Sequence, residues 1–265
     1  MTVTIPHLYK KKKDRDPIVM VTAYDATMAR IIDDGGADIL LVGDSLGMVI
    51  QGRDNTLAVT LDEMIYHTRS VRRGSRRALV VADMPFLSYQ VSSEAAIASA
   101  GRLLKEGEAQ AVKLEGGRHM AETIQRLTDV GIPVMGHIGL EPQKVHAYGG
   151  YKLQGTTQES ARHLLEDAAA IAKAGAFSVV IEGVPAQLAA EITASLAIPT
   201  IGIASGAHCD GQVLVSYDLW GFNPDFNPKF VKRYCTGYQT LKQAVCDFTQ
   251  DVRTGHFPNK SHTPK

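Results

Sequence analysis

The sequence has few cysteines, no excess of charge of either sign and no long apolar run. Its three cysteines are odd in number and lack CxxC spacing, so neither a disulfide framework nor a zinc site is indicated. Lysine and arginine number 28, as do aspartate and glutamate, so no overall charge attracts nucleic acid or an anionic membrane. The apolar runs fall short of the roughly 18 residues that a membrane span needs. We therefore expect a soluble globular protein with neither a nucleic-acid nor a membrane partner.

The one basic block is a run of four lysines at residues 10–13, which Asp14 and Asp16 follow closely. Such a mixed charge run is typical of a solvated terminus rather than of an arm that binds nucleic acid. No apolar segment of the signal-peptide kind follows the lysines, and this predicts a cytoplasmic protein.

Short apolar segments alternate with longer amphipathic ones along nearly the whole chain, which is the pattern of repeated βα units around a parallel sheet. The predicted strands are Ile18–Asp25, Ala37–Asp44, Ala78–Pro85, Ala111–Gly116, Ile132–Gly139, Ser178–Gly183, Ile198–Ser205 and Gln212–Asp218. The predicted helices are Thr60–Val71, Ser93–Glu106, His119–Val130, Gln158–Ala174 and Pro185–Ala197. Eight strands with intervening helices predict a single α/β domain over residues 1–265, a (β/α)8 TIM barrel, with a doubly wound open sheet as the alternative.

Two regions depart from this repeat. His146–Gly155 is a loop rich in glycine and tyrosine, and it is either a lid over the carboxyl ends of the strands or a plain connector. The tail over Pro228–Arg253 has a helical pattern, and we expect a helical extension that covers either the barrel or a neighbouring subunit.

Polar residues stand at the ends of five consecutive predicted strands, where barrel enzymes carry their chemistry. They are Asp44, Asp83, Lys113 with Glu115, His137 and Glu182. Side chains alternate along a strand, so Val42 and Asp44 are expected to share one face, as are Val81 and Asp83. Each acid alone is more simply a helix cap or a turn residue, and His137 alone is more often a core histidine than a ligand. Together they predict a polar cavity.

Three of these acids, Asp44, Asp83 and Glu115, lie on adjacent predicted strands about 4.8 Å apart. Without a counter-charge, three converging carboxylates repel one another and one or more holds its proton. A hard divalent cation removes the conflict, and an acidic cluster with room for water and substrate suits Mg²⁺ better than a closed Ca²⁺ site. We therefore predict a magnesium site.

Lys113 precedes Glu115 by two residues and so shares its face of the strand. A cation there can hold the carboxylate of a small 2-oxo acid whose other oxygens reach the metal, and Mg²⁺ then acts as a Lewis acid that stabilises an enolate. Glu182, two strands away and flanked by apolar residues, is the predicted general base for the proton next to the carbonyl.

The chain closely resembles the ketopantoate hydroxymethyltransferase family, also called 3-methyl-2-oxobutanoate hydroxymethyltransferases, over about nine-tenths of its length. The matching motifs, in order, are TAYD at Thr22–Asp25, VGDSLGMV at Val42–Val49, HTRSVRRG at His67–Gly74, VADMPF at Val81–Phe86, VKLEGG at Val112–Gly117, VMGHIGLEPQ at Val134–Gln143, GGYKLQG at Gly149–Gly155, IEGVP at Ile181–Pro185 and CDGQVLV at Cys209–Val215.

The resemblance implies a (β/α)8 enzyme of pantothenate biosynthesis that is a homo-oligomer, with a decamer as one candidate size. It implies transfer of a hydroxymethyl group from 5,10-methylenetetrahydrofolate to 3-methyl-2-oxobutanoate, which gives 2-dehydropantoate and tetrahydrofolate. By family analogy Asp44, Asp83 and Glu115 place the Mg²⁺, the last directly or through water. The residues implied to hold the oxo acid are Ser45 and Lys113 with the two aspartates. Glu182 is implied to take the C3 proton, and His137 matches a pocket residue to which only a positioning role can be given.

Two departures from the family pattern leave the folate contacts less certain than the oxo-acid site. Residues 202–206 read GIASG where the family usually reads GIGAG, and Glu141 stands where a threonine is usual. The nearest rival, the phosphoenolpyruvate mutase and isocitrate lyase group, generally carries a KKCGH-like loop that this sequence lacks. A non-catalytic barrel that only binds a metabolite would have no use for Glu182 as a base.

Overall fold

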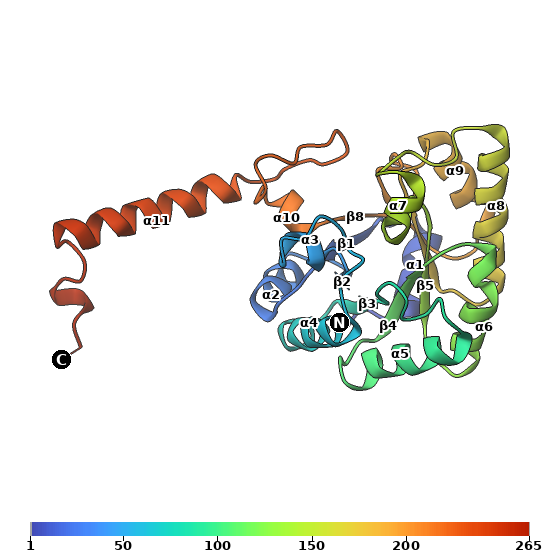
Figure 1. The fold of residues 1–265 in the computed structure, drawn as a ribbon, viewed down its shortest axis with the longest axis horizontal. Helices are drawn as coiled ribbons and strands as arrows, with labels where there is room; N and C mark the ends of the chain where they lie inside the picture. Colours follow the sequence, from blue (N-terminus) through green and yellow to red (C-terminus); the bar gives the residue numbers. More distant parts are fainter. Residues whose placement is uncertain (1, 265) are drawn as a thin grey trace. The chain divides into compact units, whose positions relative to one another are not determined.

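The computed structural model describes residues 2–264, and its centre is a closed barrel of eight parallel strands (Figure 1). The strands are β1 (Ile18–Thr22), β2 (Ile39–Val42), β3 (Leu79–Asp83), β4 (Ala111–Glu115), β5 (Val134–Gly139), β6 (Ser178–Glu182), β7 (Thr200–Ile203) and β8 (Gly211–Leu214). Each strand pairs with the next in sequence, and β8 pairs with β1. The (β/α)8 TIM-barrel prediction is confirmed, and the open-sheet alternative is wrong.

Helices cover the outside of the barrel, in blue through yellow and light orange in Figure 1. The helices of this part of the chain are α1 (Ile5–Asp14), α2 (Ala26–Asp34), α3 (Leu46–Val49), α4 (Leu61–Gly74), α5 (Ser93–Lys105), α6 (Ala121–Asp129), α7 (Val145–Tyr148), α8 (Gln158–Lys173) and α9 (Ala186–Ser195), with 3₁₀ turns η1 (Arg118–Met120) and η2 (Pro142–Lys144). The five helices predicted from periodicity are all present, with ends shifted by up to three residues. The sequence analysis did not predict α1, α2, α3 or α7, and the short helix α7 includes the first three residues of the predicted loop His146–Gly155.

Local capping chemistry explains where several helices begin and end. Ser92 Oγ accepts a hydrogen bond from Ala95 N at 3.2 Å at the start of α5. Thr60 and Glu63 form a reciprocal capping box at the start of α4. Gly131 and Gly175 follow α6 and α8 with φ of +86° and +99°, a conformation that glycine adopts without steric cost.

The barrel interior is packed with side chains that alternate along the strands. Its buried apolar cluster includes Ile39 and Leu41 of β2, Val81 of β3 and Val180 of β6, and Leu8 of α1 belongs to the same cluster. The sequence analysis placed Asp44 on the same face of β2 as Val42. Of the neighbouring residues Leu41 and Val42, however, Leu41 is the one that belongs to the buried cluster inside the barrel. The face argument is therefore wrong for Asp44, because β2 ends at Val42 and the alternation does not continue through the turn that follows.

The described residues divide into two compact units, one up to Val215 and one from Ser216 onward. The second unit contains α10 (Ser216–Leu219), α11 (Gly237–Thr254) and η3 (Lys260–His262). The predicted helical extension is confirmed, but α11 begins at Gly237, nine residues later than Pro228. No helix among residues 2–264 is both long and apolar enough to cross a membrane.

Candidate active site

The strand register explains which predicted site residues lie at the same height in the barrel. Asp83 of β3 is in register with Lys113 of β4, and Glu115 of β4 is in register with His137 of β5. Each step from strand to strand is staggered, as a closed barrel requires. The carboxyl ends of β3 to β5 therefore bring two acids, one lysine and one histidine to the same mouth of the barrel.

A buried ion pair between Lys113 and Asp83 lies within this group. Lys113 Nζ is 2.8 Å from Asp83 Oδ1 and 3.3 Å from His137 Nδ1, and both side chains of the ion pair are almost fully buried. Burial opposes the charged form of Lys113, but the surrounding carboxylates, Asp83 first among them, outweigh burial and raise its pKa. The lysine is therefore a fixed positive charge in the site.

Asp44 joins the cluster through the turn after β2. Its backbone N–H donates to Asp83 Oδ2 at 3.1 Å, and its own Oδ2 accepts from Gln143 Nε2 at 2.9 Å. Burial, followed by the charge of Asp83, raises the pKa of Asp44 from 3.8 to about 7. Gly43 leaves room for the neighbouring hydroxyl, because a Cβ there would lie only 2.7 Å from Ser45 Oγ and would displace it.

Glu115, at the end of β4, is 4% exposed and is held by backbone and side-chain groups from the loops after β3 and β5. Its Oε2 accepts from the backbone N–H of Gln143 at 3.0 Å, and its own N–H donates to Tyr89 Oη at 3.0 Å. Burial and the nearby charge of Asp44 raise the pKa of Glu115 well above its usual value. The cluster thus contains buried carboxyl groups that are costly to ionise together.

Glu182 is the most accessible acid of the group, at the end of β6. Its side chain is 21% exposed, whereas that of His137 is 3% exposed. His137 Nε2 lies 3.2 Å from Glu182 Oε2, in a close contact that lacks the alignment of a hydrogen bond. The His137 ring is thus close to Lys113 through Nδ1 and close to Glu182 through Nε2, and it connects these two residues.

The backbones of β5 and β6 also approach each other closely at the end of β5. A Cβ at Gly139 would lie 2.2 Å from the backbone oxygen of Glu182.

Ser45 follows Asp44 directly and stands before the first turn of α3. Its Oγ lies 2.9 Å from Tyr24 Oη, and it makes no capping hydrogen bond to the short helix α3. The Ser45 hydroxyl therefore contacts Tyr24 and does not cap α3.

The donor set suits a hard divalent cation in chemistry and charge. Three buried carboxylates face one buried ammonium, so the ionised cluster carries two uncompensated negative charges. Oxygen donors of this kind are the ligands that Mg²⁺ prefers. Among residues 2–264, however, no three His, Cys, Asp or Glu side chains already meet in the arrangement of a metal site. The residue types therefore fit the preference of such an ion for oxygen ligands.

The sequence analysis missed two buried residues of this site. Gln143 and Tyr89 lie one loop beyond the strand ends and link Asp44 with Glu115 by hydrogen bonds. Gln143 lies within a family motif but was given no role. The signal that could have found it is a polar side chain in the loop that follows β5, since the loops after the strands form the barrel mouth.

The two departures from the family pattern flank the site. Glu141 is buried and its Oε2 lies 2.7 Å from Lys144 Nζ, within the segment that leads into α7. Ser205 is buried at the end of β7, and its Oγ donates to Ile181 O at 2.8 Å. Ala204 adopts φ of +53°, in the left-handed region that favours glycine, where the family usually has one. Neither Glu141 nor Ser205 makes a recorded contact with Asp44 or Asp83.

A closed barrel with buried ionisable groups at the carboxyl ends of its strands defines the class of (β/α)8 barrel enzymes. The sequence profile of the ketopantoate hydroxymethyltransferase family matches residues 2–260. A relative from Pelobacter propionicus named 3-methyl-2-oxobutanoate hydroxymethyltransferase is 54% identical over 261 residues, 98% of this chain and 97% of its own. One of the same name from Thermotoga neapolitana is 56% identical over 253 residues, 96% of this chain and 93% of its own. This chain belongs to the ketopantoate hydroxymethyltransferase family.

Solved structures with a similar fold include enzymes with other names. A phosphonopyruvate hydrolase in complex with oxalate and Mg²⁺ is similar with a TM-score of 0.64 at 11% identity, over 100% of this chain and 92% of that one. A 2,3-dimethylmalate lyase of the phosphoenolpyruvate mutase and isocitrate lyase superfamily is similar with a TM-score of 0.61 at 16% identity, over 100% of this chain and 93% of that one. At these identities the likeness supports the barrel fold and nothing more.

Proposed function

We propose that the enzyme transfers a one-carbon unit from 5,10-methylenetetrahydrofolate to C3 of 3-methyl-2-oxobutanoate, with water as the source of the new hydroxyl. The products are 2-dehydropantoate and tetrahydrofolate. The observation that carries this proposal is the partly exposed carboxylate of Glu182 beside a buried cluster of carboxylates and one ammonium. Relatives that are more than half identical over the full chain carry the name of this activity.

The oxo acid is proposed to bind at the mouth of the barrel, where Ser45 and Lys113, with Asp44 and Asp83, hold it. Lys113 is suited to this because its charge is maintained by the acids around it. Asp44 and Asp83 would hold Mg²⁺, with Glu115 directly or through water, and the bound ion would polarise the keto group as a Lewis acid. The ion thereby lowers the cost of removing the proton at C3.

Glu182 is proposed to take the proton from C3 of the oxo acid. Its carboxylate is accessible from the barrel mouth, while the rest of the cluster is buried. His137 is a positioning residue, because its ring lies between Lys113 Nζ and Glu182 Oε2. A positioned general base typically contributes about 10²- to 10⁴-fold to the rate.

An assay of the purified protein tests the reaction. With Mg²⁺ and both substrates we expect 2-dehydropantoate and tetrahydrofolate to form in equal amounts, and removal of Mg²⁺ with a chelator is expected to abolish the reaction reversibly. Product without consumption of methylenetetrahydrofolate would contradict the proposed donor. The rival function is tested in parallel with phosphonopyruvate, for which no turnover is expected.

Calorimetry with 3-methyl-2-oxobutanoate tests the proposed role of the metal separately from turnover. We expect tight binding of the oxo acid with Mg²⁺ and markedly weaker binding without it, because the bound ion would attract the oxygens of the anionic substrate. Equal affinity in both conditions would refute chelation of the substrate by the metal.

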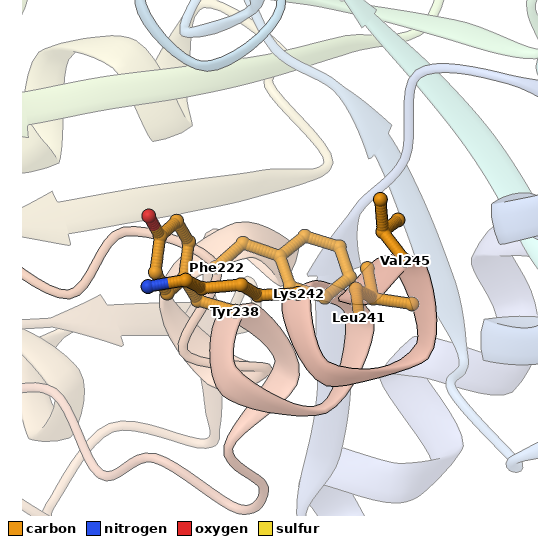
Figure 2. A pocket seen from close by; sticks show the side chains of 5 residues that line it. All are labelled: Phe222, Tyr238, Leu241, Lys242 and Val245. Atoms are coloured by element: carbon orange, nitrogen blue, oxygen red, sulfur yellow. The ribbon is translucent and has the colours of Figure 1, made fainter. Parts of the chain in front are cut away.

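The enzyme is further proposed to be a homo-oligomer. The support is α11, on which Tyr238, Leu241, Val245, Phe248 and Val252 are exposed. These residues recur at alternating spacings of three and four, the pattern of a helix face that packs against another element. Within the same unit, the first three of them line a shallow pocket of about 320 Å³ together with Phe222 and Lys242 (Figure 2).

A further inference from the structure

Gln143 occupies the point where the loops after β2, β3 and β5 meet behind the carboxylate cluster. The residue is 5% exposed and belongs to the 3₁₀ turn η2. Its Nε2 donates to Asp44 Oδ2 at 2.9 Å and to Met84 O at 3.0 Å. Its Oε1 accepts from Tyr89 Oη at 2.8 Å and from Gln90 Nε2 at 3.0 Å. The amide therefore uses both of its donors and both of its acceptor positions.

These four contacts determine the orientation of the Gln143 amide, that is, which position its oxygen takes and which its nitrogen takes. A flipped amide would place its oxygen against the carboxylate of Asp44 and the carbonyl of Met84, and its NH₂ group against that of Gln90. Three of the four contacts would then join two groups of the same kind, and only the Tyr89 hydroxyl, which can accept as well as donate, could adapt. An uncharged side chain with two donors at one end and an acceptor at the other is what this position requires, and glutamine supplies it.

The backbone of Gln143 holds the second carboxylate. Its N–H donates to Glu115 Oε2 at 3.0 Å, while Glu115 N donates to Tyr89 Oη, which in turn donates to Gln143 Oε1. One residue thus contacts Asp44 and Glu115 at once, through its side chain and its main chain. Because one oxygen of each carboxylate is held, rotation of both groups is restricted and the second oxygen of each is kept in place.

We propose that Gln143 is a positioning residue that fixes the carboxylates of Asp44 and Glu115 relative to each other for binding of the divalent cation. The inference rests on the proposed function, in which these acids hold the ion. Gln143 is not proposed to touch the substrate or the ion. Partners of this kind, which hydrogen-bond to ligating groups, typically change metal affinity by about 10- to 100-fold when they are removed.

The test compares the affinity of the full-length protein for Mn²⁺, a paramagnetic ion that accepts the same oxygen ligands as Mg²⁺. Free Mn²⁺ is measured by electron paramagnetic resonance during titration of the wild type and of Gln143→Met. The variant keeps the size and the backbone N–H but lacks the amide. We expect its Kd for Mn²⁺ to rise about 10- to 100-fold, and saturating metal to restore most of kcat.

Gln110→Met is the matched control. Gln110 Oε1 accepts from Val80 N at 3.0 Å, immediately before β4 and therefore at the opposite end of the barrel. The same substitution there removes a hydrogen bond between a glutamine and the backbone but leaves the carboxylates untouched. We expect unchanged Mn²⁺ affinity, and the unfolding temperature of both variants is measured without metal.

The outcomes separate this inference from the proposed function. If the wild type binds Mn²⁺ and folded Gln143→Met binds it within threefold as tightly, the positioning role is wrong and the proposed function stands. An equal loss in Gln110→Met would also overturn it, because the effect would then be a general one on stability. A wild type that binds no Mn²⁺ refutes both the metal site and the inference. Should Gln143→Met fail to fold, Gln143→Asn, which is too short to reach all four partners, is read by the same criteria.

Discussion

Glu182 differs from the other acids of the site in its surroundings. Asp44 and Glu115 are buried and hydrogen-bonded, and burial raises the pKa of both. Glu182 is more exposed, and its Oε2 lies 3.2 Å from His137 Nε2. A base has to reach the substrate, whereas a metal ligand can be enclosed. The exposure of Glu182 and the burial of Asp44 and Glu115 therefore agree with their proposed roles as base and metal ligands.

The role of Glu182 leads to a prediction for Glu182→Gln. The variant keeps the size and polarity of the side chain but cannot accept the C3 proton, so exchange of that proton for deuterium is expected to slow by about 10²- to 10⁴-fold. Affinity for 3-methyl-2-oxobutanoate with Mg²⁺ is expected to stay within about threefold, which calorimetry measures.

Proton NMR of the oxo acid in deuterated water follows the exchange. Glu191→Gln, an exposed position on α9, is the matched control and is expected to exchange at the wild-type rate. Exchange at the wild-type rate in Glu182→Gln would mean that another group is the base.

The connection between α2 and β3 depends on one buried carboxylate. Asp33, near the end of α2, accepts from Ala78 N at 2.7 Å through Oδ1 and from Arg76 N at 2.8 Å and Arg77 N at 3.0 Å through Oδ2. These three N–H groups belong to the segment that enters β3, whose other end carries Asp83. The carboxylate therefore fixes the start of a strand that ends in the active site.

We predict that Asp33→Asn destabilises the protein by about 2–4 kcal/mol, because the amide turns an NH₂ group toward backbone donors and leaves buried N–H groups unpaired. Urea unfolding followed by circular dichroism measures the change. The neighbouring Asp34→Asn alters only a surface ion pair with Arg30 and is expected to change stability by less than about 1 kcal/mol. Similar effects for the two substitutions would contradict this account of Asp33.

The chain as a whole combines a barrel unit that contains every proposed catalytic residue with a smaller unit whose helix α11 exposes an apolar stripe. A contiguous exposed apolar stripe is costly in water and marks a surface that packs against another molecule or segment. This is the physical basis for the proposed homo-oligomer.

We predict that Leu241→Glu together with Phe248→Glu lowers the oligomeric state, because two charges then fall on the apolar stripe of α11 (Figure 2 shows Leu241 in the pocket). Sedimentation velocity measures the mass of the assembly at several concentrations. Gln239→Glu adds a charge to α11 at an exposed residue outside the stripe and is expected to leave the mass unchanged. A wild type that sediments as a monomer would refute the homo-oligomer.

Sequence patterns predicted some parts of this protein well for identifiable reasons. The pleat of β3, β4 and β6 continues to the last residue, so Asp83, Glu115 and Glu182 were placed by alternation with their apolar neighbours. The same argument was wrong for Asp44, because β2 is shorter than predicted. The shorter helices α2 and α3 were not predicted, since few residues in each carry the apolar pattern.

Local signals in the sequence were sufficient for the barrel class, the order of its strands, most helices, the family and the set of acids with Lys113. All of these depend on periodicity or on residues close together in the chain. The ion pair of Lys113 with Asp83, the link from His137 to Glu182 and the hydrogen bonds of Gln143 came from the folded arrangement. Such contacts join residues up to 99 positions apart, and their partners depend on register and stagger, which are set when the whole barrel closes.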